Sequence, residues 1–397
     1  MPHRMSSRPR PGAGGELTAL MQGVSEGAVT RREFVVKAAG LGLSLTAVGA
    51  FLASCGSSGP SSVGSSTSAP AMDTSKPAKI TVCNWTGYID QAMLRRFERE
   101  QGIKIEYVTF TSNEQLLSRM NEGRVYDVIF PEEWAAEVLI KAGKLRALDM
   151  DLLPNFKNVT DPSFRDPPYD PGTGGKKYTA VYFFGTEGFA ARLDKINDPG
   201  ESWAIMYDAQ YRGKMTMLDG SREILGPALL TLGYGLNTTD QDELDRATTK
   251  ALGQKRLVRA YDSVNQATLI RNGQPLTECW DGDAVDAMNK VGISTIRYVL
   301  PKEGYMVWSD APSIPVNAPS PYGAHLFLDF LMEPSVAAAN ADSTGYQPVV
   351  AAADPLMKSL VQRAMRPTSE QIAGGTFPRD LGDFNAAFDE AYKKIVG

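Results

Sequence analysis

The feature that most restricts the fold is a regular alternation of two kinds of segment, which begins at Lys79. Runs rich in β-branched and aromatic residues predict strands at 79–85, 103–110 and 126–130, and amphipathic runs predict helices at 90–101, 113–122 and 132–141. Such a series predicts an α/β fold with a parallel sheet. Ligand-binding residues are expected after each strand, because parallel strands present their binding loops at their carboxyl ends.

A second region with the same mixture follows a stretch rich in Pro, Asp and Gly at 149–177, which is expected to cross the surface. Strands are predicted at 178–192, 214–218, 276–280 and 293–300, and helices at 243–251, 257–263, 322–331 and 334–342. The chain has 397 residues, of which 43% are hydrophobic and 22% are charged. A chain of this size and composition is expected to form two lobes.

The first part of the chain has the order of an export signal that ends in a lipid attachment site. Arg31 and Arg32 precede an apolar run at 38–53, which is shorter than the roughly 20 residues of a membrane-spanning helix. The run leads to the lipobox-like sequence LASC, with Cys55 as the lipidation site. Residues 1–54 are thus predicted to be a twin-arginine-type lipoprotein signal, and 55–77 a Ser/Gly-rich tether. The alternative is a buried helix that ends in an ordinary cysteine.

Residue counts exclude several kinds of chemistry. The two histidines are His3 and His325, and the three cysteines are Cys55, Cys83 and Cys279, so neither a histidine-rich nor a four-cysteine metal site is expected. No nucleophile stands beside a plausible histidine base, so we expect neither an enzyme nor a cofactor. The net charge of −5 argues against a nucleic-acid partner. Cys83 and Cys279 are expected to be buried thiols, with a bridge between them as the alternative.

Four of the five tryptophans lie at or just beyond predicted strand ends, beside acidic or small polar residues. The segments are 84–88, 131–134, 280–283 and 308–310. Aromatic faces can pack on methylene groups and attract cations, and carboxylates bind ammonium groups. Because these segments contain no basic residue, the pattern predicts a cationic ligand such as an aliphatic diamine or triamine.

Nine short motifs occur in order from about residue 78 to the end of the chain. They are NWTGYI at 84–89, SNE at 112–114, YDVIFP at 126–131, SRE at 221–223, LGYGLNTTD at 232–240, PKEG at 301–304, WSD at 308–310, IP at 314–315 and TGYQP at 344–348. Together they resemble the solute-binding proteins of bacterial spermidine/putrescine ABC transporters. The resemblance implies an α/β, two-lobed periplasmic-binding-protein fold (type II), with a mostly parallel sheet in each lobe and hinge crossings, and it implies no catalysis.

The resemblance also implies which segments form each lobe and which residues line the site. Lobe 1 would comprise 78–187 and 310–354, and lobe 2 would comprise 188–309 and 355–397. The lobe 1 wall would consist of Trp85, Thr86, Tyr88, Trp134 and Tyr346. The lobe 2 wall would consist of Glu223, Trp280, Asp283 and Trp308, with Asp310 where the chain crosses back.

Four positions depart from the family pattern. Gly87 and Gly220 stand where relatives carry acids, and a late glutamine of some relatives is missing near 377–379. Conversely, Glu132 replaces a small hydroxyl residue. One hypothesis is that Glu132 binds the ammonium that an acid at 87 would have bound. The alternative is that Glu132 only begins the following helix, where the helix dipole favours an acid.

The expected function is the extracytoplasmic polyamine-binding component of an ABC importer. It would close around spermidine or putrescine and deliver the ligand to permease subunits with a cytoplasmic ATPase. A monomer is expected, held on the outer face of the cytoplasmic membrane by its lipid or periplasmic. The alternatives are a sensory solute-binding lipoprotein, or a receptor for another small amine or an amino acid derivative such as 4-aminobutyrate. The carboxylate of such a derivative would need Arg222 or Arg379.

Acylation at Cys55 can be tested directly. We expect the exported wild-type protein to begin at a diacylglycerol-modified Cys55 and the Cys55→Ala variant to carry no lipid. Mass spectrometry of the N-terminal peptide distinguishes the two. An intact N-terminus on the exported wild-type protein would show that the lipobox is not used.

Overall fold

A computed structural model describes residues 72–397 of the chain. The predicted signal at 1–54, Cys55 and most of the 55–77 tether lie outside the described residues. Within 72–397, no helix is both long enough and apolar enough to cross a membrane.

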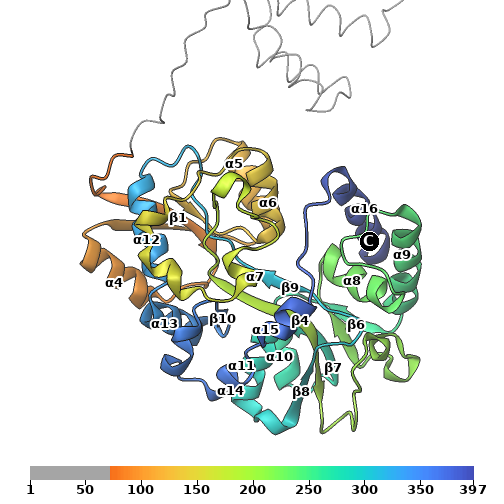
Figure 1. Cartoon of the computed structure of the whole chain (residues 1–397). Coiled ribbons are helices and arrows are strands. Elements are labelled where there is room, and N and C mark those ends of the chain that lie inside the picture. The colour runs from red at the N-terminus through yellow and green to blue at the C-terminus, as the bar shows by residue number, and fades with distance from the viewer. Residues whose placement is uncertain (1–71) are drawn as a thin grey trace, which may run out of the picture. The chain divides into compact units, whose positions relative to one another are not determined.

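The first sheet has three parallel strands in the order β2-β1-β3. They are β1 (Lys79–Trp85), β2 (Lys104–Phe110) and β3 (Val128–Ile129). A helix follows each strand, namely α4 (Gln91–Gln101), α5 (Asn113–Asn121) and α6 (Glu133–Lys141), as Figure 1 shows. The predicted strand–helix series is therefore confirmed, although β3 is shorter than the predicted 126–130.

Local sequence signals set the ends of these helices. Asp90 begins α4 by accepting a hydrogen bond from the Ala92 N–H, and Gly102 ends it at a φ of 71°, which disfavours any other residue. Ser112 begins α5 in the same way by accepting from the Gln115 N–H. Because the helices start soon after the strands end, the intervening loops lie at the carboxyl edge of the sheet.

The second sheet has seven strands and is mixed. They are β4 (Phe183–Arg192), β5 (Met215–Met217), β6 (Val258–Tyr261), β7 (Leu276–Trp280), β8 (Ile296–Val299), β9 (Val307–Ser309) and β10 (Gln347–Pro348). The order is β10-β4-β7-β5-β6, and β8 and β9 also pair with β4. Strand β5 pairs in parallel with β6 and β7, whereas β4 is antiparallel to all four of its neighbours. This sheet thus has more antiparallel pairing than expected, because one long strand crosses between two packed regions.

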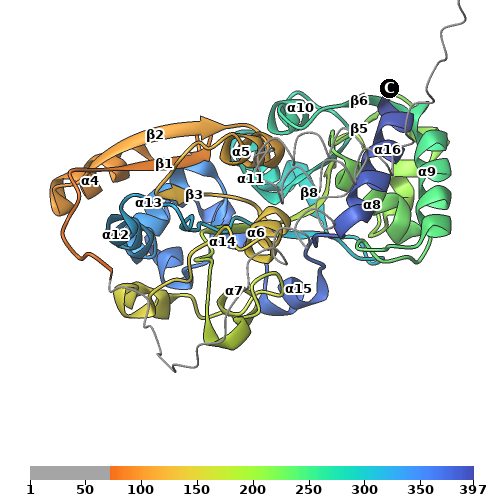
Figure 2. The ribbon, with the colours of Figure 1, turned by 90° about the horizontal axis from the view of Figure 1, so that it is seen from above.

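The remaining helices cover the sheets and their ends. They are α7 (Pro162–Arg165), α8 (Ser221–Thr231), α9 (Gln241–Lys255), α10 (Gln266–Arg271), α11 (Asp281–Val291), α12 (Pro321–Leu331), α13 (Pro334–Thr344), α14 (Leu360–Ala364), α15 (Ser369–Gly374) and α16 (Asn385–Val396). Figures 1 and 2 show α8, α9 and α16 side by side, and their apolar faces share one buried cluster. Short 3₁₀ turns connect many of the other elements.

Strand β4 joins two hydrophobic cores. All ten of its residues are buried. Phe183 and Phe184 pack in the first core, with residues of β1 and α12, whereas Phe189 packs in the second core, with residues of β5 and β7. The chain returns at β9. Met306, just before this strand, belongs to the second core, and Trp308, within it, belongs to the first. The paired strands β4 and β9 therefore form the expected crossings between two lobes.

Two sequence expectations fail locally. The run 257–263 was expected to be a helix, but Val258–Tyr261 is an edge strand that pairs with β5. A short apolar run fits either structure, and pairing with β5 decides the outcome here. The 149–177 stretch was expected to cross the surface, yet it buries Phe156, Phe164 and Tyr169 in the first core. Spaced aromatic residues anchor this stretch despite its turn-rich sequence.

The predicted α/β fold class is confirmed, whereas the lobe boundaries stay predictions. The last part of the chain contributes to both regions, because Met357, Ile372 and Phe377 pack in the first core while Phe388 packs against α8 and α9. Cys83 and Cys279 are free and buried, as expected.

Candidate ligand-binding site

A row of four aromatic rings runs across the junction of the two cores. The ring centroids of Tyr88 and Tyr346 are 5.5 Å apart, and those of Tyr346 and Trp308 are 5.1 Å apart at an interplanar angle of 89°. Trp308 is in turn 6.1 Å from Trp280. These residues come from the loop after β1, the segment before β10, strand β9 and the end of β7. The fold thus brings together four of the predicted site residues, which are far apart in sequence.

Asp310 lies beside the Tyr88 end of this row. The Tyr88 hydroxyl donates to Asp310 Oδ2 at 2.5 Å. Burial raises the pKa of Asp310 well above its usual range, the nearby Glu132 carboxylate raises it further, and the hydrogen bond from Tyr88 opposes the shift. No basic side chain of residues 72–397 is among the causes of this pKa shift, so the described part of the chain gives the carboxyl no countercharge.

Glu132 is held in place by two side chains rather than by the helix that follows it. Asn113 Nδ2 donates to Glu132 Oε2 at 2.6 Å, and Trp134 Nε1 donates to the same oxygen at 3.3 Å. The backbone of Glu132 forms a bridge with that of Asp310. Although Glu132 immediately precedes α6, its side chain makes no capping hydrogen bond. Hydrogen bonds from Asn113 and Trp134 thus orient the Glu132 carboxylate, and the helix-start alternative depends on the helix dipole alone.

Glu223 lies in the first turn of α8, and its charge acts on Glu132. The carboxylate of Glu223 folds back over Gly220, where an added Cβ would lie 2.8 Å from its Cδ. Gly220 therefore makes room for Glu223, which explains why no acid stands at 220 here. Burial raises the pKa of Glu132 to about 7, and the charge of Glu223 adds to the shift. The two carboxylates are close enough to repel each other.

Two more acids stand at the start of α11, beside the other end of the ring row. Burial raises the pKa of Asp281 to about 7, and that of Asp283 to about 7. Gly282 between them lets the Tyr346 ring lie on the backbone, because a Cβ there would be 2.5 Å from Tyr346 Cε1. Asp283 was predicted from the sequence. Asp281 was not, although it stands in the same tryptophan–acid segment.

Trp85, Thr86 and Trp134 lie on the first-core side and do not join the ring row. The Trp85 ring packs on Phe110 at a centroid distance of 4.4 Å, and Thr86 Oγ1 donates to the Phe110 carbonyl at 3.5 Å. Trp134 donates its indole N–H to Glu132. Trp134 therefore lies beside Glu132, whereas Trp85 and Thr86 contact Phe110 at the end of β2.

Both arginines considered for a ligand carboxylate are engaged elsewhere. Arg379 donates from Nε and Nη2 to the Glu137 carboxylate at 2.9 and 2.8 Å. Arg222 donates to the backbone carbonyls of Leu236 and Arg379, and its guanidinium lies 4.4 Å from the centre of the Phe388 ring. The structure therefore offers neither group to a ligand such as 4-aminobutyrate.

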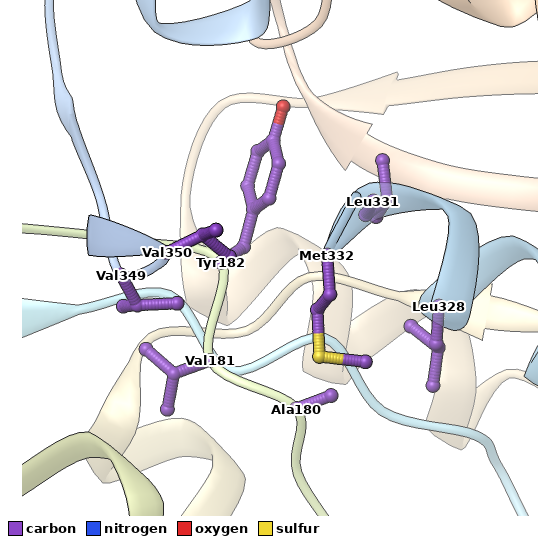
Figure 3. A pocket seen from close by; sticks show the side chains of 8 residues that line it. All are labelled: Ala180, Val181, Tyr182, Leu328, Leu331, Met332, Val349 and Val350. Atoms are coloured by element: carbon purple, nitrogen blue, oxygen red, sulfur yellow. The ribbon is translucent and has the colours of Figure 1, made fainter. Parts of the chain in front are cut away.

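A separate cavity lies within the first core, as Figure 3 shows. It has a volume of about 10 Å³ and is lined by apolar residues such as Leu328, Met332 and Val349. This is room for about one water molecule, and such a lining offers a water few hydrogen bonds. The cavity contains none of the predicted site residues and is too small for a solute.

Comparison with known proteins assigns the chain to a family. Residues 92–365 match the family model described as bacterial extracellular solute-binding protein. The chain belongs to this family. Its expected family resemblance and fold are thereby confirmed, and a solute-binding protein of this extracellular family is exported.

Three known proteins show how close the similarity is. This solute-binding protein is 32% identical over 319 residues to the spermidine/putrescine-binding periplasmic protein of Salmonella typhimurium, covering 79% of this chain and 90% of that protein. It is 32% identical over 339 residues to the putrescine-binding periplasmic protein SpuD of Pseudomonas aeruginosa, covering 80% and 91%. The solved structure of the spermidine/putrescine ABC transporter substrate-binding protein PotD of Streptococcus pneumoniae matches with a TM-score of 0.70 at 26% identity, covering 80% and 98%.

The two interpretations of Glu132 predict opposite effects on stability without ligand. Because the pKa of Glu132 is raised to about 7, its protonated form favours folding, and this contribution is lost as the pH rises through 7. We expect Glu132→Gln to raise the melting temperature by about 1–3 °C at pH 8, where ionised Glu132 repels Glu223, and to leave it unchanged at pH 5.

A matched control is Asp242→Asn, since Asp242 is an exposed acid in the first turn of α9. Loss of its interaction with the helix dipole should lower stability slightly. If Glu132→Gln also lowers the melting temperature at pH 8, Glu132 serves only to start α6.

Proposed function

We propose that this solute-binding protein captures an aliphatic polyamine, such as spermidine or putrescine, and delivers it to the permease of an ABC importer. The observation that carries the proposal is the row of aromatic rings with desolvated carboxyls beside both ends, Asp310 at one and Asp283 at the other, neither of which has a basic partner among the described residues. The proposed ligand-binding residues are Trp85, Thr86, Tyr88, Glu132, Trp134, Glu223, Trp280, Asp283, Trp308, Asp310 and Tyr346.

The two parts of the site suit the two parts of such a ligand. Methylene groups can lie along the rings of Tyr88, Tyr346 and Trp308, which removes apolar surface from water. Ammonium groups can pair with the carboxylates beside the row, and a hydrogen bond to a charged group contributes about 1.5–3 kcal/mol. Anionic solutes would add to the repulsion among these acids, so a cation is the ligand that the site favours.

The relatives agree with this ligand class, because both curated relatives carry spermidine or putrescine in their names. The departures at Gly87 and Gly220 support a rearranged set of acids in which Glu132 replaces the missing carboxylate on the lobe 1 side.

The proposed function also includes two lobes that close, a lipid anchor and a permease partner. Lobe 1 (78–187 and 310–354) and lobe 2 (188–309 and 355–397) would close by bending at the β4 and β9 crossings. Cys55 would carry the lipid that holds this monomeric, non-catalytic receptor at the outer face of the cytoplasmic membrane. A tethered receptor suits transfer of the ligand to a membrane permease and its ATPase.

Calorimetric titration of the delipidated protein with putrescine, spermidine, spermine and 4-aminobutyrate tests the function. We expect one-site binding of at least one polyamine and none of 4-aminobutyrate. Asp310→Asn and Asp283→Asn should each weaken polyamine binding by roughly tenfold or more, because each removes a countercharge from a desolvated ammonium. Glu132→Gln should have an effect of similar size.

Asp286→Asn is the matched control. Asp286 lies on α11 like Asp283, but its carboxylate is half exposed and paired with Arg271, so affinity should not change. Polyamine affinity that survives both Asp310→Asn and Asp283→Asn would show that the ligand binds elsewhere, and tight binding of 4-aminobutyrate alone would replace the proposed ligand class.

A further inference from the structure

Asp281 is a buried acid that the proposed site does not yet use. It is the first residue of α11, directly after Trp280. Its carboxylate lies against the crossing strand β4, since a Cβ added to Gly185 would clash with Asp281 Oδ1 and would lie 2.6 Å from Trp308 Cζ2. The Asp281 carboxylate and the edge of the Trp308 ring therefore both pack against Gly185.

The hydrogen bonds of Asp281 are incomplete. Oδ1 accepts from the Thr186 backbone N–H at 3.3 Å, but Oδ2 has no partner in the described chain, although the residue is only 1% exposed. A carboxylate oxygen that is buried without a partner normally destabilises a protein by more than a single hydrogen bond contributes. Such an atom indicates that something else completes its bonding.

The described residues around Asp281 supply no positive charge to its carboxylate. Burial is the main cause of its raised pKa, the backbone N–H groups of Thr186 and Gly282 oppose the shift, and the Asp283 carboxylate increases it. The donors that reach the Asp281 carboxylate are backbone N–H groups of Thr186 and of the first turn of α11, and none of them carries a charge. Asp281 Oδ2 is thus a hydrogen-bond acceptor that has no cationic donor among the described residues.

We propose that Asp281 is a ligand-binding carboxylate that acts with Asp283 on one end of the ligand, and that the pair makes the site select aliphatic triamines over diamines. The inference rests on the proposed polyamine function and refines it. Beside the Tyr88 end of the row, the charge of Glu223 acts on Glu132 and that of Glu132 acts on Asp310, whereas beside the other end the charge of Asp283 acts on Asp281. A diamine can place one ammonium beside the acids at each end of the ring row. A triamine brings a third positive charge, which Asp281 can neutralise.

Titration of the wild type and Asp281→Asn with putrescine and spermidine tests the inference. We expect the substitution to weaken spermidine binding by roughly tenfold and putrescine binding by less than about threefold, with no change in Asp286→Asn. A structural role for Asp281 would instead weaken binding of both amines by the same factor. Circular dichroism of each variant establishes that it is folded.

A charge-neutralised ligand provides a second test that needs no variant. Acetylation of one terminal amine removes one charge from spermidine, so the wild type should bind N-acetylspermidine with roughly the affinity of putrescine. Equal affinity of the wild type for putrescine and spermidine, or an equal loss for both in Asp281→Asn, would overturn the role of Asp281 and leave the proposed function intact. If the wild type binds none of these amines, the proposed function itself fails.

Discussion

Strand β4 is the element on which the rest of the structure depends, because it belongs to both hydrophobic cores. It is buried along its whole length and pairs with four other strands. At the crossing, Gly185 has no room for a side chain, and this is what allows Trp308 and Asp281 to approach the strand. The central aromatic residue and an acid of the site are therefore seated on the crossing itself. A bend at this crossing would change the positions of both residues, and would thereby couple the proposed ligand binding to closure.

Electrostatics then determines which ligand can stabilise the closed arrangement. Glu132, Glu223 and Asp310 come from different parts of the chain, and desolvation raises the pKa of each carboxyl. Among residues 72–397, Arg222 beside Glu223 is the one basic group that opposes these pKa shifts. Burial of like charges without a counterion is unfavourable, since the low dielectric strengthens repulsion and removes hydration. In the proposed function, a bound polycation would reverse the sign of this contribution, so the residues that oppose closure without ligand would support it once the ligand is present.

Much of the fold could be predicted from local patterns, but the contacts within the site could not. The strands at 79–85 and 276–280 agree with the sequence because their periodicity and flanking signals are strong. The strand Val258–Tyr261 was misassigned because its outcome depends on pairing with a distant segment. In the same way, residue types predicted an aromatic and acidic site. The hydrogen bond from Asn113 to Glu132 and the close approach of Asp281 to Gly185 arise only in the folded chain and could not be predicted.

The most direct measurement is the number of protons released when a polyamine binds at pH 7. Without ligand, the pKa values of Glu132, Asp281 and Asp283 are raised to about 7, so each carboxyl is partly protonated. A bound ammonium favours the ionised forms, and the amines of putrescine are already protonated at this pH. Calorimetry in buffers of different ionisation enthalpy should therefore show release of on the order of one proton per ligand. Identical binding enthalpies in all buffers would contradict the claim that uncompensated buried carboxyls receive the cation.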